Sequence, residues 1–324
     1  MRVVVLAGGL GGSRLARALA EAIDPGELTI VGNVGDDVEI LGLHVSPDLD
    51  TILYTLTGRL DEAKGWGRAG ESWNALETVA ELGGESWFRL GDLDLGVHLV
   101  RTEALRRGEP LSAVTARIAG AFGLEPALLP ATDERLRTWL ATPAGDQPFQ
   151  EWFVARGHRD EVDGVRFEGA DTARPAPRVI EALEAADLIA IAPSNPFVSI
   201  GPILAVAGIR EAVERRSVPA VAVSPLIGGE AVRGPAARML ARLRGGTGPQ
   251  QVTDCYKGLI DALVIDEADA GQEAGVRTIV TRTLMSDAEA EAGVRTIVTR
   301  TLMDDAEGRR RVAEAVLESV AALR

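Results

Sequence analysis

Short, continuous apolar runs alternate with amphipathic segments along this chain. The first run, Val3–Ala7, leads through a glycine-rich turn into a segment with apolar residues at helical spacing, for which Ser13 is a candidate N-cap. A second apolar run, Leu28–Asn33, follows. Because strand, glycine turn, helix and strand make a βαβ unit, the opening predicts the first strands of a parallel, doubly wound sheet.

The same pattern returns late in the chain. Apolar runs occur at Leu188–Ala192, Ala220–Val223 and Ala262–Asp266, with amphipathic segments between them. Runs without polar alternation are typical of parallel strands that are covered on both faces. The predicted fold class is therefore α/β, with a doubly wound, mostly parallel Rossmann-like sheet. We expect residues 1–60 and 175–324 to form this nucleotide-binding core.

Residues 61–174 break the pattern and predict a mostly helical insertion that forms part of the substrate site. Helical stretches come first and short strand-like segments follow, at Asn74–Leu82, Leu111–Phe122, Arg137–Ala141, Gln150–Ala155 and Val165–Glu168. We expect this largely helical insertion, with its small β excursion, to lie over the sheet as a lid or wall.

The C-terminal part contains a duplication. Residues 273–290 recur at 291–308 with 16 of 18 positions identical. Two copies are too few for a solenoid, so a local duplication of one strand and turn is the simpler interpretation. Since an amphipathic helix, Asp305–Leu323, follows only the second copy, Val294–Val298 should occupy the core position. The first copy, Val276–Val280, would then be an added edge strand or a looped-out segment.

Charge and composition exclude or disfavour several functional classes for this protein. Thirty-four basic and 48 acidic residues give a net charge of −14, which disfavours nucleic acid or an anionic membrane as a partner. An anionic small substrate would need local help from backbone N–H groups, an arginine or a metal ion. Cys255 is the only cysteine, so an intrachain disulfide framework is excluded. No apolar run approaches the roughly 18 residues of a spanning helix, and a cytoplasmic enzyme is expected.

Glycines follow the first strand at a position suited to a phosphate. Gly9, Gly11 and Gly12 allow close approach of a ligand, and the following helix N-terminus offers free N–H donors. The dinucleotide fingerprint would need glycine where Arg14 stands, and no P-loop lysine motif is present. The glycines therefore predict a nucleotide-cradling loop of another kind, with a simple tight turn as the alternative.

Acidic residues follow the second strand. Asp36 and Asp37 come directly after it, and Asp48 and Asp50 follow in the segment Ser46-Pro47-Asp48-Leu49-Asp50-Thr51. Strand C-termini border the ligand crevice of such sheets, and Mg²⁺ prefers a few carboxylates together with substrate phosphates. The cluster suits a magnesium site. The alternative is that each aspartate forms a turn or caps a helix, as Asp50 could.

Two further segments carry candidate binding residues. A tryptophan-rich stretch precedes Arg89, and its indoles could stack on a planar heterocycle or form the core of the insertion. Arg89 could bind an anionic ligand or pair with Asp92. After the Leu188–Ala192 strand, a proline-stiffened loop offers short polar groups at the crevice: Ser194, Asn195, Pro196 and Ser199.

Taken together, these motifs resemble the 2-phospho-L-lactate transferase family of deazaflavin-coenzyme (F-420) biosynthesis. The resemblance covers nearly the whole chain in order, in the segments LAGGLGGSRL, VGNVGDD, SPDLDTILYTL, GWG with ESWNALE, WFRLGDLDL, HLVRTEALRRGEPLS, LLPATDE, APSNPFVSIGPIL and SPLIGG. The duplication departs from the family pattern, which has one such strand.

The resemblance implies a reaction. Members join a lactyl- or enolpyruvyl-diphosphoguanosine donor to the deazaflavin Fo, release GMP and use Mg²⁺. It implies that Asp50, Thr51 and Arg89 contact Fo, and that Asp36 and Asp50 hold the metal and serve catalysis. The glycine loop and the Ser194–Ser199 loop would hold the guanosine nucleotide, and the family type implies a homodimer. The choice between the two donors stays open.

Two other functions remain as alternatives. One is a non-catalytic, nucleotide-sugar-binding regulator of a related family, for which several of the motifs would be unnecessary. The other is a nicotinamide-dependent oxidoreductase, disfavoured by the broken fingerprint at Arg14.

Overall fold

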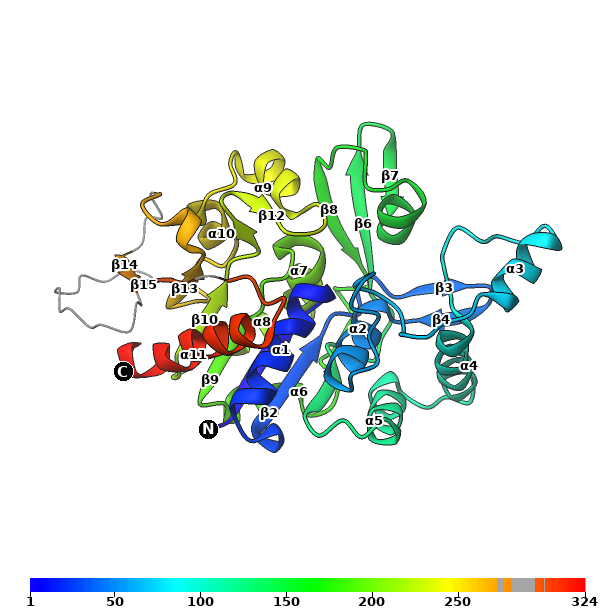
Figure 1. Cartoon of the computed structure of the whole chain (residues 1–324), viewed down its shortest axis with the longest axis horizontal. Helices are drawn as coiled ribbons and strands as arrows, with labels where there is room; N and C mark the ends of the chain where they lie inside the picture. The colour runs from blue at the N-terminus through cyan, green and yellow to red at the C-terminus, as the bar shows by residue number, and fades with distance from the viewer. Residues whose placement is uncertain (273–276, 281–294, 300, 324) are drawn as a thin grey trace.

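A twisted parallel sheet forms the centre of the computed structural model, which describes residues 1–272, 277–280, 295–299 and 301–323 (Figure 1). Eight strands lie in the order β14-β15-β13-β10-β9-β1-β2-β5, and every neighbouring pair is parallel. Their bounds are β1 Val3–Ala7, β2 Leu28–Gly32, β5 Ala127–Pro130, β9 Leu188–Ile191, β10 Ala220–Val223, β13 Ala262–Ile265, β14 Arg277–Val280 and β15 Arg295–Val298. The predicted fold class, with its doubly wound parallel core, is confirmed.

Helices cover both faces of the sheet (Figure 1). Helices α1, α2 and α11 pack together on one face, and α6 and α8 lie on the other. The helices have the bounds α1 Gly9–Ala22, α2 Pro47–Leu56, α3 Asn74–Glu81, α4 Asp92–Arg106, α5 Leu111–Ala121, α6 Val179–Ala185, α7 Gly201–Ala205, α8 Ile209–Glu214, α9 Ala236–Arg244, α10 Pro249–Cys255 and α11 Ala306–Leu323. All residues of the central strands β1, β9, β10 and β13 are buried, which explains their unbroken apolar runs.

Helix α1 begins earlier than the sequence predicts. Gly9 has a φ of +63°, a conformation that glycine adopts without strain, and the chain turns directly from β1 into the helix there. Ser13 therefore lies inside the helix and is not its N-cap; its hydroxyl donates to the Leu10 carbonyl at 2.9 Å. The first turn of the helix is consequently made of the glycine-rich segment itself.

The region 61–174 differs from the predicted insertion in two respects. Strand β5 lies within it and extends the main sheet beside β2. Residues Glu151–Ala155, expected in a strand, form a short π-helical turn instead. The strands predicted near 137–141 and 165–168 are present in a separate three-stranded antiparallel sheet, in the order β7-β6-β8. That sheet consists of β6 Arg137–Thr142, β7 Gly145–Pro148 and β8 Gly164–Glu168.

Two small hairpins complete the fold. The first, β3 Val38–Ile40 with β4 Leu43–Val45, leads into helix α2. The second, β11 Leu226–Ile227 with β12 Glu230–Ala231, follows β10. Within the described part of the chain, no helix is both long and apolar enough to cross a membrane.

The duplicated segment follows the predicted arrangement. The second copy provides β15, which pairs with β13 in the core sheet, and the first copy provides β14, which pairs only with β15 at the edge. Val276 and Val294, which the prediction included in these strands, lie outside the described residues. The first copy is therefore an added edge strand.

Candidate functional site

The site lies where the order of the strands reverses. From β1 the chain crosses to β2 on one side, whereas β9, on the other side of β1, continues outward to β10. The loops after β1 and β9 therefore leave the same edge of the sheet in opposite directions and open a crevice between them. A cavity of about 770 Å³ occupies this position.

The loops after β1 and β9 are held together by direct contacts. The Ser194 hydroxyl donates to the Gly8 carbonyl at 2.7 Å and lies 3.2 Å from the Gly8 nitrogen. A Cβ atom on Gly11 would collide with the carbonyl oxygen of Pro193. The glycines therefore serve two purposes, since they let the loops meet and leave the first turn of α1 open to the cavity.

Most of the predicted nucleotide-binding residues line the cavity. Gly9, Gly11, Ser194, Asn195 and Ser199 do so. Gly12 and Pro196 do not line it. Gly12 packs against the Ser194 side chain behind the loop, and Pro196 is buried at the start of a short helical turn.

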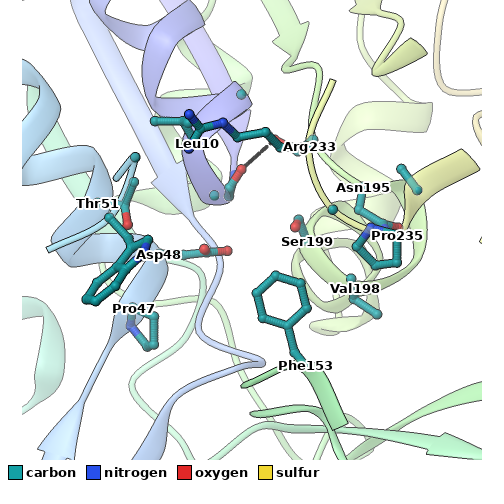
Figure 2. Close-up of a pocket in the computed structure, with 18 of the residues that line it drawn as sticks. Leu10, Pro47, Asp48, Thr51, Phe153, Asn195, Val198, Ser199, Arg233 and Pro235 are labelled. Atoms are coloured by element: carbon teal, nitrogen blue, oxygen red, sulfur yellow. Dashed lines mark hydrogen bonds between the residues drawn. The ribbon is translucent and has the colours of Figure 1, made fainter. Parts of the chain in front are cut away.

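A pair of buried aspartates borders the cavity beside the tip of α1. Asp36, after β2, and Asp48, in the first turn of α2, both line the cavity. The Asn33 side-chain amide donates to Oδ1 of Asp36 at 3.2 Å and to Oδ2 of Asp48 at 2.9 Å. The Gln150 amide donates to Oδ2 of Asp36 at 3.2 Å. In Figure 2 the Asp48 carboxylate points into the cavity, with Ser199 across from it.

Both aspartates hold protons more tightly than usual. Burial raises the pKa of Asp36 well above its ordinary value, and the charges of Asp48 and Asp37 add to this effect. Burial also raises the pKa of Asp48 to about 6, although hydrogen bonds from Asn33 and Gly9 act to lower it. Among the described residues, no group of three or more His, Cys, Asp or Glu side chains is arranged to hold a metal ion. The cavity offers the two carboxylates of Asp36 and Asp48. Such a pair suits Mg²⁺, because this ion also takes phosphate oxygens as ligands.

Asp50 lies away from the cavity. It is buried, and its carboxylate forms a two-pronged ion pair with Arg101 of α4, while the His98 ring nitrogen lies 3.8 Å away. Asp48 and Thr51 are three residues apart on one face of α2, and Asp50 lies on another. Helical periodicity therefore brings Asp48, not Asp50, to the cavity, and this was the signal that sequence reasoning missed.

Aromatic residues of the 61–91 segment form a first group on the cavity lining. Trp66, Trp87 and Phe88 line it together with Arg89. The Arg89 guanidinium lies 4.6 Å from the centre of the Trp73 ring and has no ion pair with Asp92, which accepts hydrogen bonds from the 72–75 segment instead. Thr51 lines the cavity as well (Figure 2).

A second aromatic group, which the sequence analysis did not predict, lines the same cavity. Phe153 stacks on Phe149 and on His158, each at 5.3 Å between ring centres. All three side chains line the cavity, and Phe153 points into it (Figure 2). The cavity thus has two aromatic surfaces from different segments of the chain, and the aspartate pair and the tip of α1 line it as well.

Solved structures resemble the fold. A UPF0052-family protein from Bacillus halodurans matches with a TM-score of 0.61 at 18% sequence identity, over 98% of both chains. At this identity the likeness shows a shared fold alone.

Other known proteins share a much higher sequence identity with this chain. The family model described as 2-phospho-L-lactate transferase CofD matches residues 3–302. A protein of Streptomyces griseus named phosphoenolpyruvate transferase is 43% identical over 89% of this chain and 94% of its own length. A protein of the same name from Mycolicibacterium smegmatis is 39% identical over 89% of this chain and 94% of its own. The chain therefore belongs to the 2-phospho-L-lactate transferase CofD family, which makes it a transferase of coenzyme F-420 biosynthesis.

Proposed function

We propose that this protein transfers a phosphoenolpyruvyl group from enolpyruvyl-diphosphoguanosine to the terminal hydroxyl of the deazaflavin Fo, with GMP as the leaving group. The relatives named phosphoenolpyruvate transferase favour the enolpyruvyl donor over the lactyl donor. The observation that carries the proposal is that one cavity is lined by two separate aromatic groups and by a buried acidic pair. Two planar ring systems and a diphosphate between them fit that arrangement.

Each aromatic group of the cavity suits one substrate. We propose that Fo lies against Trp66 and Trp87, with Arg89 and Thr51 as its polar partners. The guanine base would then lie against Phe153, with Asn195 and Ser199 as polar side chains of the same cavity. Stacking on aromatic rings suits both ligands, since each is a flat heterocycle. The diphosphate would reach the first turn of α1, where free backbone N–H groups favour an anion.

The acidic pair suits Mg²⁺. We propose that Asp36 and Asp48 hold the ion, in place of the pair Asp36 and Asp50 expected from the resemblance. The structural reason is that Asp36 and Asp48 share the Asn33 amide and face the cavity, whereas Asp50 is occupied by Arg101. When bound, Mg²⁺ would neutralise phosphate charge in this strongly acidic protein.

The other side chains position the reactants. Phosphoryl transfer depends on alignment and charge neutralisation more than on a protein nucleophile. In the proposed reaction the Fo hydroxyl oxygen forms a bond to the phosphorus that bears the enolpyruvyl group and gives up its proton to the solvent. The bond from that phosphorus to the GMP oxygen breaks, and GMP leaves. We propose that Asp50 contributes indirectly, because its ion pair with Arg101 fixes the rotation of α2 and so directs Asp48 and Thr51 into the cavity.

The test is a direct assay. The protein is incubated with Fo, Mg²⁺ and either the enolpyruvyl or the lactyl donor, and the products are identified by mass spectrometry. We expect the dehydro form of coenzyme F-420-0 and GMP with the enolpyruvyl donor. Absence of product with both donors would contradict the proposal. Binding of a nucleotide sugar without turnover would instead support the regulatory alternative.

A further inference from the structure

Two arginines from different parts of the chain contribute to the cavity. Arg14, on α1, and Arg233, after the β11–β12 hairpin, both line it. Arg233 extends across Leu10 at the tip of α1 (Figure 2), and its Nη1 donates to the Lys64 carbonyl at 2.7 Å. This one contact uses a single N–H of the Arg233 guanidinium, which has five.

Both guanidiniums lack a carboxylate partner within the part of the chain that the structure describes. Among the described residues, no acidic side chain lies within ion-pair distance of Arg14 or Arg233. Their neighbours are paired: Lys64 lies 2.7 Å from Asp61, and Arg17, one turn further along α1, pairs with Glu21 and Glu62. Although the chain has 48 acidic residues, these two cavity arginines have no acidic partner among the described residues and are available for a ligand.

The two charges also act on each other. Burial lowers the pKa of Arg14, and the positive charge of Arg233 lowers it further, whereas Glu62 and Asp304 act in the opposite direction. Two like charges near one another lower the stability of the empty site, and an anion between them would relieve the repulsion. Arg14 also occupies the place at which the dinucleotide fingerprint has glycine, so a long cationic side chain replaces a bare backbone there.

Counting the anionic groups of the proposed donor identifies a ligand for this pair. In the proposed function the diphosphate already has the α1 tip and the Mg²⁺ held by Asp36 and Asp48, so the remaining anion is the carboxylate of the three-carbon group that is transferred. We propose, on the basis of the proposed function, that Arg14 and Arg233 bind this carboxylate and so select donors that carry one. A guanidinium fork matches a carboxylate in two-pronged geometry, which gives direction as well as charge.

The experiment compares ligands with and without the carboxylate. Binding of enolpyruvyl-diphosphoguanosine and of GDP, both with Mg²⁺, is measured by titration calorimetry for the wild type, Arg14→Gln, Arg233→Gln and the control Arg17→Gln. Loss of a charge-assisted hydrogen bond corresponds to roughly ten- to a hundredfold in affinity. We expect each cavity variant to bind the donor at least tenfold more weakly, with GDP affinity changed less than twofold. Arg17→Gln should leave both affinities unchanged.

Several outcomes would overturn the proposal. Equal weakening of donor and GDP would assign the arginines to the diphosphate, and unchanged donor affinity would remove them from the site. A wild type that binds the donor no more tightly than GDP would also contradict it. If a Gln variant fails to fold, Arg14→Lys and Arg233→Lys keep the charge but lose the fork, and intermediate donor affinity is expected of them. Because the readout is binding, a wild type that shows this selectivity but gives no product with Fo would contradict the proposed function alone.

Discussion

The carboxylates of Asp36 and Asp48, which come from different elements, are joined by one amide. Asn33 Nδ2 lies 3.2 Å from Oδ1 of Asp36 and 2.9 Å from Oδ2 of Asp48. Asn33 immediately follows β2, and its own side-chain oxygen accepts from the Gly35 nitrogen at 2.7 Å. The end of β2 thus fixes the position of both acids relative to the tip of α1.

The first prediction concerns this pair. Asp48→Asn keeps the size of the side chain and its hydrogen bond geometry but removes a charge, so kcat should fall by roughly a hundred- to a thousandfold, as is typical when an electrostatic contribution to the transition state is lost. Initial rates across a range of Mg²⁺ concentrations measure this effect. Asp24→Asn, at an exposed turn, is the matched control. Normal turnover by Asp48→Asn at low Mg²⁺ would exclude Asp48 as a metal ligand.

The second prediction separates the two possible roles of Asp50. Asp50→Ala leaves the buried Arg101 guanidinium without its partner, which should lower the free energy of unfolding by about 3–5 kcal/mol. Urea denaturation measures the loss. Arg101→Met should also be destabilising, and should reduce activity, although Arg101 does not line the cavity. If Asp50→Ala instead keeps its stability and loses only Fo affinity, then Asp50 contacts Fo directly.

The third prediction is a pH dependence. Burial raises the pKa of Asp94 to about 7, and the charges of Asp50 and Glu71 act in the same direction. The folded protein therefore holds a proton that the unfolded chain has released between about pH 4 and pH 7, so the Asp94 contribution to stability falls as the pH rises through this window. In Asp94→Asn the side chain cannot titrate, so the stability of this variant does not fall for this reason as the pH rises.

The expected result is the difference in stability between Asp94→Asn and the wild type. Taking this difference cancels the effect of other titrating groups such as His98. Thermal unfolding should show Asp94→Asn and wild type to be similar near pH 4. Relative to wild type, the variant should gain stability up to about pH 7 and level off above it, by at most about 4 kcal/mol for a shift of three pKa units. A difference that is constant with pH would show that Asp94 is not held protonated by the fold.

The fourth prediction concerns the two aromatic groups of the cavity. Phe153→Ala should weaken GDP binding by roughly tenfold and leave Fo binding unchanged, because the lost stacking surface is the one assigned to the nucleotide. Trp66→Ala is the reciprocal variant and should weaken Fo alone. Fluorescence titration of Fo and calorimetry of GDP measure both. If Phe153→Ala weakens Fo and spares GDP, the assignment of the two aromatic groups is reversed.

The fifth prediction concerns the duplication. Deletion of residues 273–290 removes an edge strand that pairs only with β15, and leaves β15 beside β13. Since loop-closure entropy changes only slowly with length, activity should persist and the melting temperature should shift by a few degrees. Activity and calorimetric scans of the deleted chain provide the check. Global unfolding would show that the edge strand is needed for the core.

Apolar runs alone predicted five of the eight strands of the central sheet, because fully buried parallel strands carry no polar alternation. The duplication argument placed β15 and β14 correctly for a topological reason, since the closing helix follows only the second copy. Strand β5 was missed because Ala127–Pro130 is short, ends in proline and lies within a region read as an insertion.

The loops that line the cavity were predicted more reliably than the individual side chains that do so. Glycines and prolines marked the two loops that meet at the strand-order reversal, since those residue types reflect backbone requirements. The choice between Asp48 and Asp50 depended on which face of α2 is turned inward, and this is fixed by the contact with α4 far along the chain. Phe153 and Arg233 become neighbours of the site only through tertiary packing, and their local sequence gives no sign of it.

One measurement addresses the central claim most directly. Crystals grown with Fo, GDP and Mn²⁺ in place of Mg²⁺ would locate the metal by its anomalous scattering and both ring systems by their density. We predict Mn²⁺ between Asp36 and Asp48 and the GDP phosphates, with Fo against Trp66 and guanine against Phe153. Mn²⁺ at Asp50, or both ligands competing for one aromatic group, would contradict it.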